Sequence, residues 1–270
     1  MQNITQVINT KSLTKKYKDF TALNSVSLTV EKGNVYGLIG KNGAGKTTFF
    51  KVIMGLTEKT SGDININESD DLNAGRSKIG FMIGVSFFPY LNAYKNIEYY
   101  RRMKGINDKK ETERVLKLVN LYDVKKPFKA FSMGMKQRLG IANALLGNPE
   151  VIILDEPING LDPQGIIDIR KIIIDINKNY NTTFIISSHI LSELDLVAKK
   201  YGIIDCGVLL KEVEQKELHK QRSKSTIIEL DKTDKAIQVL EDNGIKYTIK
   251  DQEITLEEFY FNLLGGGRND

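Results

Sequence analysis

The chain has 270 residues, which is enough for one large α/β domain with a small appendage or for two modest domains. Hydrophobic residues make up 41% and charged residues 27%, a balance that excludes an intrinsically disordered chain. No stretch approaches the roughly 18 consecutive apolar residues of a membrane-spanning helix. The N-terminus lacks the basic start and apolar run of a signal peptide, so we expect the protein to stay in the compartment where it is made.

The net charge of +5 raises the question of a nucleic-acid partner. Only 8 of the 39 basic residues are arginine, and lysines stand among acidic residues, as in residues 109–114, which we interpret as a solvated helix face. We therefore expect no nucleic-acid partner. The single cysteine, Cys206, cannot form an internal disulfide, and we expect it to be a small buried residue on a strand.

The first elements read as strands followed by a glycine-rich loop. Hydrophobic and polar residues alternate within residues 12–36, with Val26, Leu28 and Val30 on one face, which predicts a half-buried strand. The sequence then predicts a turn at 31–34, a short buried strand at 35–39 and, after the loop, a helix at 47–56.

From about residue 92 to 148, apolar residues recur at helical spacing and predict a small helical insertion. Beyond it, strands and helices alternate, which favours crossover connections and a largely parallel sheet. The predicted elements are a strand at 151–154, a helix at 163–180, a strand at 183–187, a helix at 192–198 and a strand at 201–204.

Residues 211–270 are less regular and predict a small α+β appendage to a main domain of residues 1–210. Strands are expected at 226–230 and 246–249, with a helix at 233–243 between them. A last helix is expected from the capping box that runs from Thr255 to Glu258.

The glycine-rich loop fits the pattern G-x-x-x-x-G-K-S/T between a strand and a helix. Glycines let successive backbone N–H groups point at phosphate oxygens, and the following helix N-terminus adds its positive dipole. Lys46 would neutralise the β- and γ-phosphates of ATP, and the Thr47 hydroxyl would bind Mg²⁺. The predicted nucleotide-binding residues are Gly40, Asn42, Gly43, Gly45, Lys46, Thr47 and Thr48.

Four apolar residues ending in Asp155 and Glu156 are typical of a central parallel strand that reaches a ligand crevice. Asp155 is predicted to hold Mg²⁺, and Glu156 to polarise the attacking water. A strand that ends in acidic residues is common, so this motif gains its weight from the loop at Gly40.

Together these motifs resemble the ATP-binding subunit of an ABC (ATP-binding cassette) transporter over about the first 210 residues. The resemblance implies an α/β P-loop NTPase fold with a parallel-sheet core, an antiparallel β subdomain and the helical insertion. Tyr17 would stack on adenine, and His189 would sense the γ-phosphate. Taken alone, Tyr17 could be an ordinary strand aromatic, and a lone histidine after a strand is usually structural.

The segment Ser132-Met-Gly-Met-Lys-Gln137 resembles the family's signature, although Met133 and Met135 replace the usual residues. The resemblance implies that Ser132, Gly134 and Gln137 bind the ATP of a second copy. It also places Asp162, in Gly160-Leu-Asp, at the dimer interface. In isolation, a serine at this spacing is often only a helix N-cap.

The chain departs from the family at Gly84, where a glutamine or glutamate usually touches Mg²⁺. Ser86 or a water could substitute, or the cassette could couple differently. The apolar residues 87–90 could dock a permease helix or form a local core.

The resemblance implies an ATPase that pairs head to tail with a second cassette, the same or homologous, and drives an integral-membrane permease. The protein would then lie on the inner face of the cell membrane. The signature and appendage most resemble ABC-2-type exporters of bacitracin, lantibiotics or drugs. The alternative is a soluble or regulatory cassette with weak hydrolysis and a non-transport partner.

Overall fold

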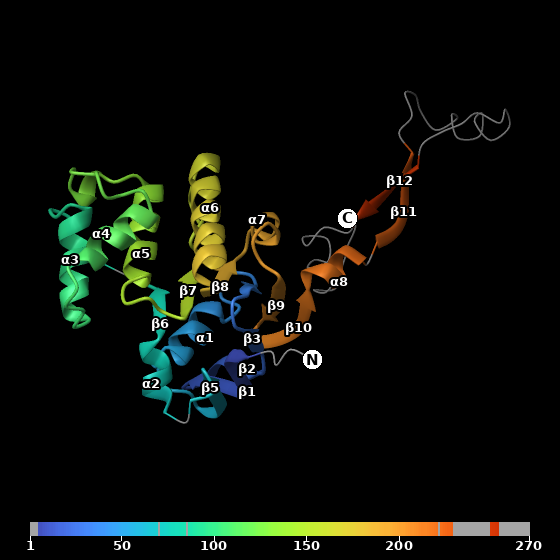
Figure 1. Ribbon diagram of the computed structural model, residues 1–270. Helices are drawn as coiled ribbons and strands as arrows, with labels where there is room; N and C mark the ends of the chain where they lie inside the picture. Colours follow the sequence, from blue (N-terminus) through green and yellow to red (C-terminus); the bar gives the residue numbers. More distant parts are fainter. Residues whose placement is uncertain (1–4, 70, 85, 221, 229–248, 254–270) are drawn as a thin grey trace. The chain divides into compact units, whose positions relative to one another are not determined.

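In the computed structural model, residues 5–69, 71–84, 86–220, 222–228 and 249–253 are described (Figure 1). The chain forms two compact units, Met1–Val213 and Glu214–Asp270. The boundary lies close to the residue 210 expected from the sequence. Within the described residues, no helix is long and apolar enough to span a bilayer.

The core of the first unit is a six-stranded sheet in the order β10-β9-β4-β8-β7-β6. The pairs β9–β4, β4–β8, β8–β7 and β7–β6 are all parallel. Every residue of β4 and β8 is buried, as expected for central strands covered on both faces. The strands are β4 (Val35–Ile39), β6 (Ile79–Met82), β7 (Val151–Asp155), β8 (Thr183–Ser188), β9 (Lys200–Asp205) and β10 (Val208–Glu214).

The helices that connect this sheet begin close to the predicted positions. Helix α6 has the predicted bounds, whereas α1 and α7 end earlier than the sequence suggested. Gly55, with φ of 71°, lies in the turn that follows α1. The helices are α1 (Lys46–Ile53), α2 (Leu72–Ser77), α6 (Pro163–Tyr180) and α7 (Leu191–Asp195).

A second, antiparallel sheet in this unit has β1 at its centre, paired with β2, β3 and β5. The predicted alternation is confirmed, since Val26, Leu28 and Val30 are buried. The strand is not continuous, because the buried Thr10 hydroxyl donates to Val26 O (3.2 Å) and accepts from Leu28 N (3.1 Å) between β2 and β3. The strands are β1 (Gln6–Tyr17), β2 (Phe20–Val26), β3 (Thr29–Glu31) and β5 (Ser61–Ile66).

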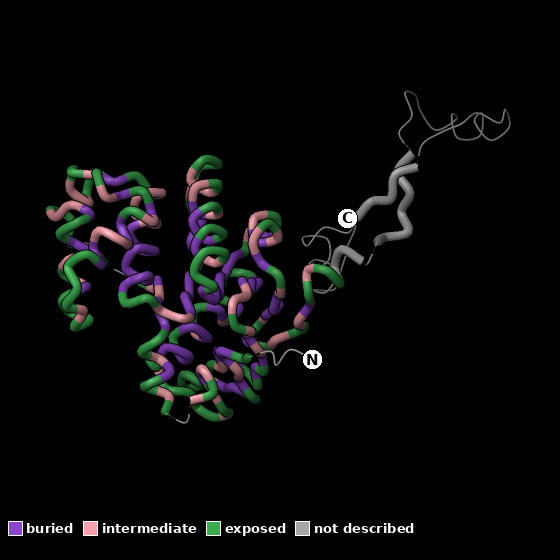
Figure 2. The backbone as a smooth tube through the Cα atoms, viewed as in Figure 1, coloured by how far each residue is buried: buried purple, intermediate pink, exposed green. Residues whose placement is uncertain are grey.

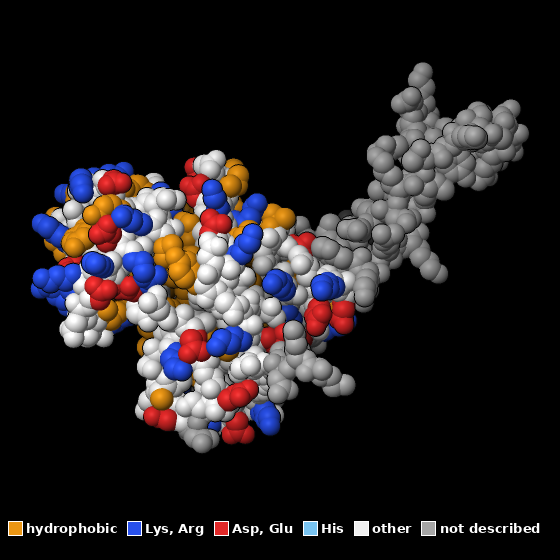
Figure 3. Space-filling model, viewed as in Figure 1, with side chains coloured by type: hydrophobic (Ala, Val, Ile, Leu, Met, Phe, Trp, Pro, Cys, Tyr) orange, Lys and Arg blue, Asp and Glu red, His pale blue; other side chains and the backbone are white. Residues whose placement is uncertain are grey.

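The predicted helical insertion is confirmed as a group of helices that lies beside the parallel sheet (Figure 1). Its core includes Ile97, Val115 and Val119, and Figure 2 shows the buried inner turns of α5. On the face in Figure 3, basic and acidic side chains are interspersed over these helices. The elements are α3 (Ala93–Met103), α4 (Lys110–Leu118), the 3₁₀ helix η1 (Phe128–Ala130) and α5 (Met133–Ala144).

Two expectations about single residues are wrong. Glu111, expected on a solvated face, is 6% exposed. Its burial alone raises the carboxyl pKa, but hydrogen bonds from Arg114 (2.7 Å) and from the Gly147 N–H (2.8 Å) outweigh burial and lower the pKa. Cys206 is exposed and has a φ of 44°, because it stands in the turn after β9 and not on a strand.

The second unit contains α8 (Gln215–Lys220) and the antiparallel pair β11 (Arg222–Ile228) and β12 (Ile249–Glu253). These strands overlap the strands predicted at 226–230 and 246–249. The helices predicted at 233–243 and from Thr255 lie outside the described residues.

A charge cluster joins α3 to α4 in the helical insertion. Glu98 accepts hydrogen bonds from Arg101 (2.7 and 2.9 Å), Arg102 (2.8 Å) and the Thr112 hydroxyl (3.0 Å). The Arg101 guanidinium, only 4% exposed, is the main reason that the pKa of Glu98 falls from 4.5 to about 2.

We predict that Glu98→Gln lowers the free energy of unfolding at pH 7 by about 1–3 kcal/mol, because Arg101 loses its charged partner inside the insertion. The folded pKa of Glu98 is depressed, so its contribution is complete above the unfolded value of 4.5 and disappears as pH falls towards about 2. Urea unfolding of the wild type and of the Glu98→Gln variant at pH 7 and pH 3 measures the difference in their free energies of unfolding. A difference as large at pH 3 as at pH 7 would contradict the prediction.

Candidate active site

The loop between β4 and α1 has the backbone that phosphate binding requires. Gly43 and Gly45 have φ of 84° and 107°, in the left-handed region that favours glycine. Gly45 is also the N-cap residue of α1, so the first free N–H groups of the helix open onto the loop. A Cβ at Gly40 would lie 2.4 Å from Ile204 O, so the close approach of β9 also requires glycine there.

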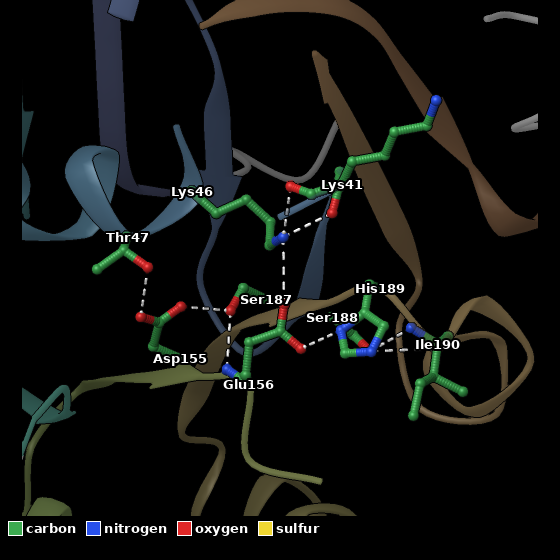
Figure 4. Close-up of polar contacts among 10 residues, drawn as sticks. Lys41, Lys46, Thr47, Asp155, Glu156, Ser187, Ser188, His189 and Ile190 are labelled. Carbon is green, nitrogen blue, oxygen red and sulfur yellow. Dashed lines mark hydrogen bonds and ion pairs between the residues drawn. The ribbon is translucent and has the colours of Figure 1, made fainter. Parts of the chain in front are cut away.

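Lys46 lies in the concave side of this loop (Figure 4). Its Nζ donates to Gly40 O (2.5 Å) and Lys41 O (3.2 Å) and lies 3.2 Å from Glu156 Oε1. The residue is 5% exposed, so its charge is held where solvent screens it little. A phosphate bound in the loop would replace neutral carbonyl partners with charged oxygens.

Strand register brings the two acidic residues to the same edge of the sheet as the loop. Strands β7 and β8 are parallel, with Asp155 opposite Ser187. Asp155 Oδ2 accepts from the Thr47 hydroxyl (2.7 Å), and Oδ1 accepts from the Ser187 hydroxyl (2.7 Å). Ser187 Oγ also accepts from Glu156 N (2.8 Å). Ser187 was not predicted from the sequence, because a serine near the end of a strand carries no motif.

Glu156 connects the P-loop to the histidine after β8. Its Oε1 faces Lys46, and its Oε2 lies 2.7 Å from His189 Nδ1 (Figure 4). Glu156 has a φ of 51°, uncommon for a non-glycine residue and typical of functional sites held by their surroundings. Of the residues predicted from the sequence, the structure thus brings together Lys46, Thr47, Asp155, Glu156 and His189.

A cleft of about 280 Å³ is lined by Lys46, Thr47 and Glu156 of this group, whereas Asp155 and His189 are not among its described lining residues. Tyr17 is not among its lining residues and is 42% exposed, with Lys15 Nζ 4.6 Å from its ring centre. Phe20, its cross-strand partner, is 63% exposed and does line the cleft. Phe20 was not predicted from the sequence, because its place opposite Tyr17 comes from the hairpin between β1 and β2. The described residues that line the cleft are Phe20, Ala22, Lys41, Asn42, Gly43, Gly45, Lys46, Thr47, Thr48 and Glu156.

Comparison with known proteins agrees with this geometry. The sequence pattern of the ABC transporter family matches residues 23–159. The bacitracin transport ATP-binding protein BcrA of Enterococcus faecalis is 37% identical, over 97% of this chain and 97% of its own length. The chain belongs to the ABC transporter family. The lantibiotic transport ATP-binding protein SrtF of Streptococcus pyogenes is 41% identical, over 77% of this chain and 91% of its own.

Among solved structures, the chain resembles an ATP-binding cassette determined as a dimer in a post-hydrolysis state with ADP and Pi. The TM-score is 0.68 with 26% identity, over 77% of this chain and 98% of that one. The predicted fold is confirmed, and the protein is an ATP-binding subunit with ATPase activity.

Of the four residues predicted for the signature and the dimer interface, Ser132 and Asp162 cap helices. The Ser132 hydroxyl accepts from Met135 N (3.3 Å) at the start of α5, and the Asp162 carboxylate accepts from Gly165 N (3.0 Å) at the start of α6. Ser132 and Asp162 are exposed, and Gln137 is half-buried on α5. Gly134 follows in the first turn of α5. None of these four residues lines the described part of the P-loop cleft.

Gly84 follows β6, is exposed and has a φ of 59°. A Cβ built there meets no atom within 4 Å beyond its two chain neighbours. Of the aromatic residues that follow, Phe87 is half-buried against the rings of Tyr100 and Phe128, whereas Tyr90 is 79% exposed. The segment thus divides between a local aromatic core and an exposed surface.

We predict that Lys46→Ala weakens ATP binding by roughly 10–100-fold, since it removes a charged hydrogen bond of about 1.5–3 kcal/mol to phosphate. ATPase activity should become undetectable. Titration with a fluorescent ATP analogue and a phosphate-release assay measure both effects. Lys51→Ala, an exposed lysine on the same helix, is the control. Undiminished ATPase activity of Lys46→Ala would refute the P-loop assignment.

We predict that Gly84→Gln raises the ATPase rate severalfold, because a Cβ fits at this position and the glutamine amide oxygen can serve as a metal ligand. A non-glycine residue at a φ of 59° costs about 1–3 kcal/mol, and Gly84→Ala controls for that strain. Phosphate release by the three proteins is compared at saturating ATP. Equal rates for the Gln and Ala variants would show that the site does not lack a ligand.

Proposed function

We propose that this ABC subunit hydrolyses ATP with Mg²⁺ between two cassettes and thereby drives export of a peptide antibiotic or drug through a separate permease. The observation that supports it most is the polar network that joins the P-loop to the ends of β7 and β8. Within a single chain this network brings together a phosphate-binding loop, two carboxylates and a histidine, and each has a distinct chemical role.

The donors at the network fit a magnesium ion. Mg²⁺ usually binds through one or two carboxylates, hydroxyls and the phosphates of its nucleotide. Thr47 Oγ1 and Asp155 Oδ2 are hard oxygen ligands, 2.7 Å apart at the mouth of the loop. These two residues would hold the ion, which would supply positive charge beside the β- and γ-phosphates.

Glu156 and His189 would act on the water and the γ-phosphate. Glu156 is 19% exposed by its side chain, so it reaches the cleft while its Oε1 stays close to Lys46. Its carboxylate can accept a proton from a water aimed at the γ-phosphate. His189, 36% exposed, contacts the other carboxylate oxygen and so holds Glu156 in place, while it remains able to contact phosphate.

A second copy would complete the site. The exposed start of α5, with Ser132 and Gly134, offers helix N–H groups for a γ-phosphate but does not line the described cleft of its own chain. In a head-to-tail dimer, the start of α5 of each copy would face the P-loop of the other, and Asp162 would lie at the interface. The structural relative determined as a dimer with ADP and Pi supports the pairing of two cassettes.

The transport role rests on the curated relatives, whose names give bacitracin and lantibiotics as cargo. We infer a cargo of this class and an integral-membrane permease that carries it, with this subunit on the inner face of the cell membrane. We propose that the exposed aromatic residues Phe88 and Tyr90, in the segment between Gly84 and α3, dock the permease.

We predict that Glu156→Gln forms a stable dimer with ATP and Mg²⁺, because the amide keeps the shape of the site but cannot accept the water proton. Gel filtration should show the variant as a dimer with ATP and as a monomer with ADP, while the wild type stays monomeric after turnover.

The double variant with Lys46→Ala is the control and should stay monomeric. A Glu156→Gln protein that binds ATP but never dimerises would contradict the shared site. Co-purification of the wild type from membranes with an integral-membrane polypeptide tests the transport role.

A further inference from the structure

Two serines end β8, and their hydroxyls serve different parts of the chain. Both are fully buried, at 0% exposure. The Ser188 hydroxyl stays local, since it donates to Ile190 O (3.2 Å) and accepts from Ile190 N (2.9 Å). The Ser187 hydroxyl instead crosses to the neighbouring strand β7 and contacts both acidic residues of the site (Figure 4).

The Ser187 hydroxyl makes two hydrogen bonds, one as donor and one as acceptor, to two consecutive residues. It donates to Asp155 Oδ1 at 2.7 Å and accepts from Glu156 N at 2.8 Å. A hydroxyl has one proton, so Ser187 donates to Oδ1 alone, while Oδ2 accepts from Thr47. The strand register, which sets Asp155 opposite Ser187, makes this contact a consequence of the sheet.

The second bond acts on the Glu156 backbone. A non-glycine residue at a φ of 51° costs about 1–3 kcal/mol and persists only where its surroundings hold it. The Glu156 N–H would lack its buried partner if Ser187 lost its hydroxyl. The direction in which the Glu156 side chain leaves the strand end therefore depends on Ser187.

We propose that Ser187 is a positioning residue that holds Asp155 and Glu156 as one unit, so that Asp155 presents Oδ2 to Mg²⁺ and Glu156 reaches the attacking water. The inference rests on the proposed function and adds a buried residue that is not among the lining residues of the described cleft. Loss of a residue that orients a metal ligand typically weakens metal affinity by roughly 10–100-fold.

The test measures the Mg²⁺ concentration that gives half-maximal ATP-dependent dimer in the Glu156→Gln background, by gel filtration. Adding Ser187→Ala should raise that concentration by roughly 10–100-fold. Adding Ser187→Thr, which keeps a hydroxyl, or Ser188→Ala, which removes the neighbouring buried hydroxyl, should leave it within about threefold. Binding of a fluorescent ATP analogue in EDTA should be equal in all four proteins.

In the chain with Glu156 intact, Ser187→Ala should lower kcat by roughly 10-fold and leave KM for ATP at saturating Mg²⁺ within about twofold. A merely structural role predicts instead that Ser187→Ala and Ser188→Ala lower the melting temperature alike and leave the Mg²⁺ midpoint unchanged. That result would overturn the proposal. A Ser187→Thr protein that is as stable as its parent but has the same raised Mg²⁺ midpoint as Ser187→Ala would also overturn it.

The outcomes separate this inference from the proposed function. If the parent Glu156→Gln protein forms no ATP-dependent dimer, the proposed shared site is wrong. If the parent dimerises and Ser187→Ala leaves the Mg²⁺ midpoint unchanged, only the role proposed for Ser187 is wrong.

Discussion

The parallel pairing of β4, β8 and β7 is the constraint on which the site depends. Parallel strands end at the same edge of a sheet, so the loop after β4, the carboxylates after β7 and the histidine after β8 meet there without any local sequence connection. Every residue of β4 and β8 is buried, and the parallel register pairs Ser187 of β8 with Asp155 of β7. The contacts of Thr47, Asp155 and Ser187 follow from this register.

Charge balance at that edge explains the contacts of Lys46. Asp155 and Glu156 bring two carboxylates together, and Lys46 supplies a buried positive charge beside them. Neutral carbonyls of Gly40 and Lys41 complete its hydrogen bonds. The lysine therefore lies where it can exchange a carboxylate for phosphate, and the network around Glu156 must adjust when it does.

Much of the fold and site could be predicted because the motifs that indicate them are short, local stretches of sequence. The P-loop, the acidic strand end and His189 each stand in a recognisable sequence context. Ser187 could not be predicted, since its role comes from a partner 32 positions earlier across the sheet. Glu111 was misjudged for the same reason: its carboxylate accepts a hydrogen bond from Gly147 N, which follows α5 and lies 36 positions later.

The helix-capping position of Ser132 has a consequence for mixtures of intact and defective subunits. In the proposed dimer, each ATP lies between the P-loop of one chain and the start of α5 of the other. A chain that has lost Lys46 still places the start of its α5 opposite the P-loop of a normal partner. A mixed pair therefore keeps one working site, the one formed by the normal P-loop. In a cell that makes both chains, activity would therefore fall in proportion to the share of defective chains. A defect in the loop of one chain and a defect at the helix start of another could complement each other in a mixed pair.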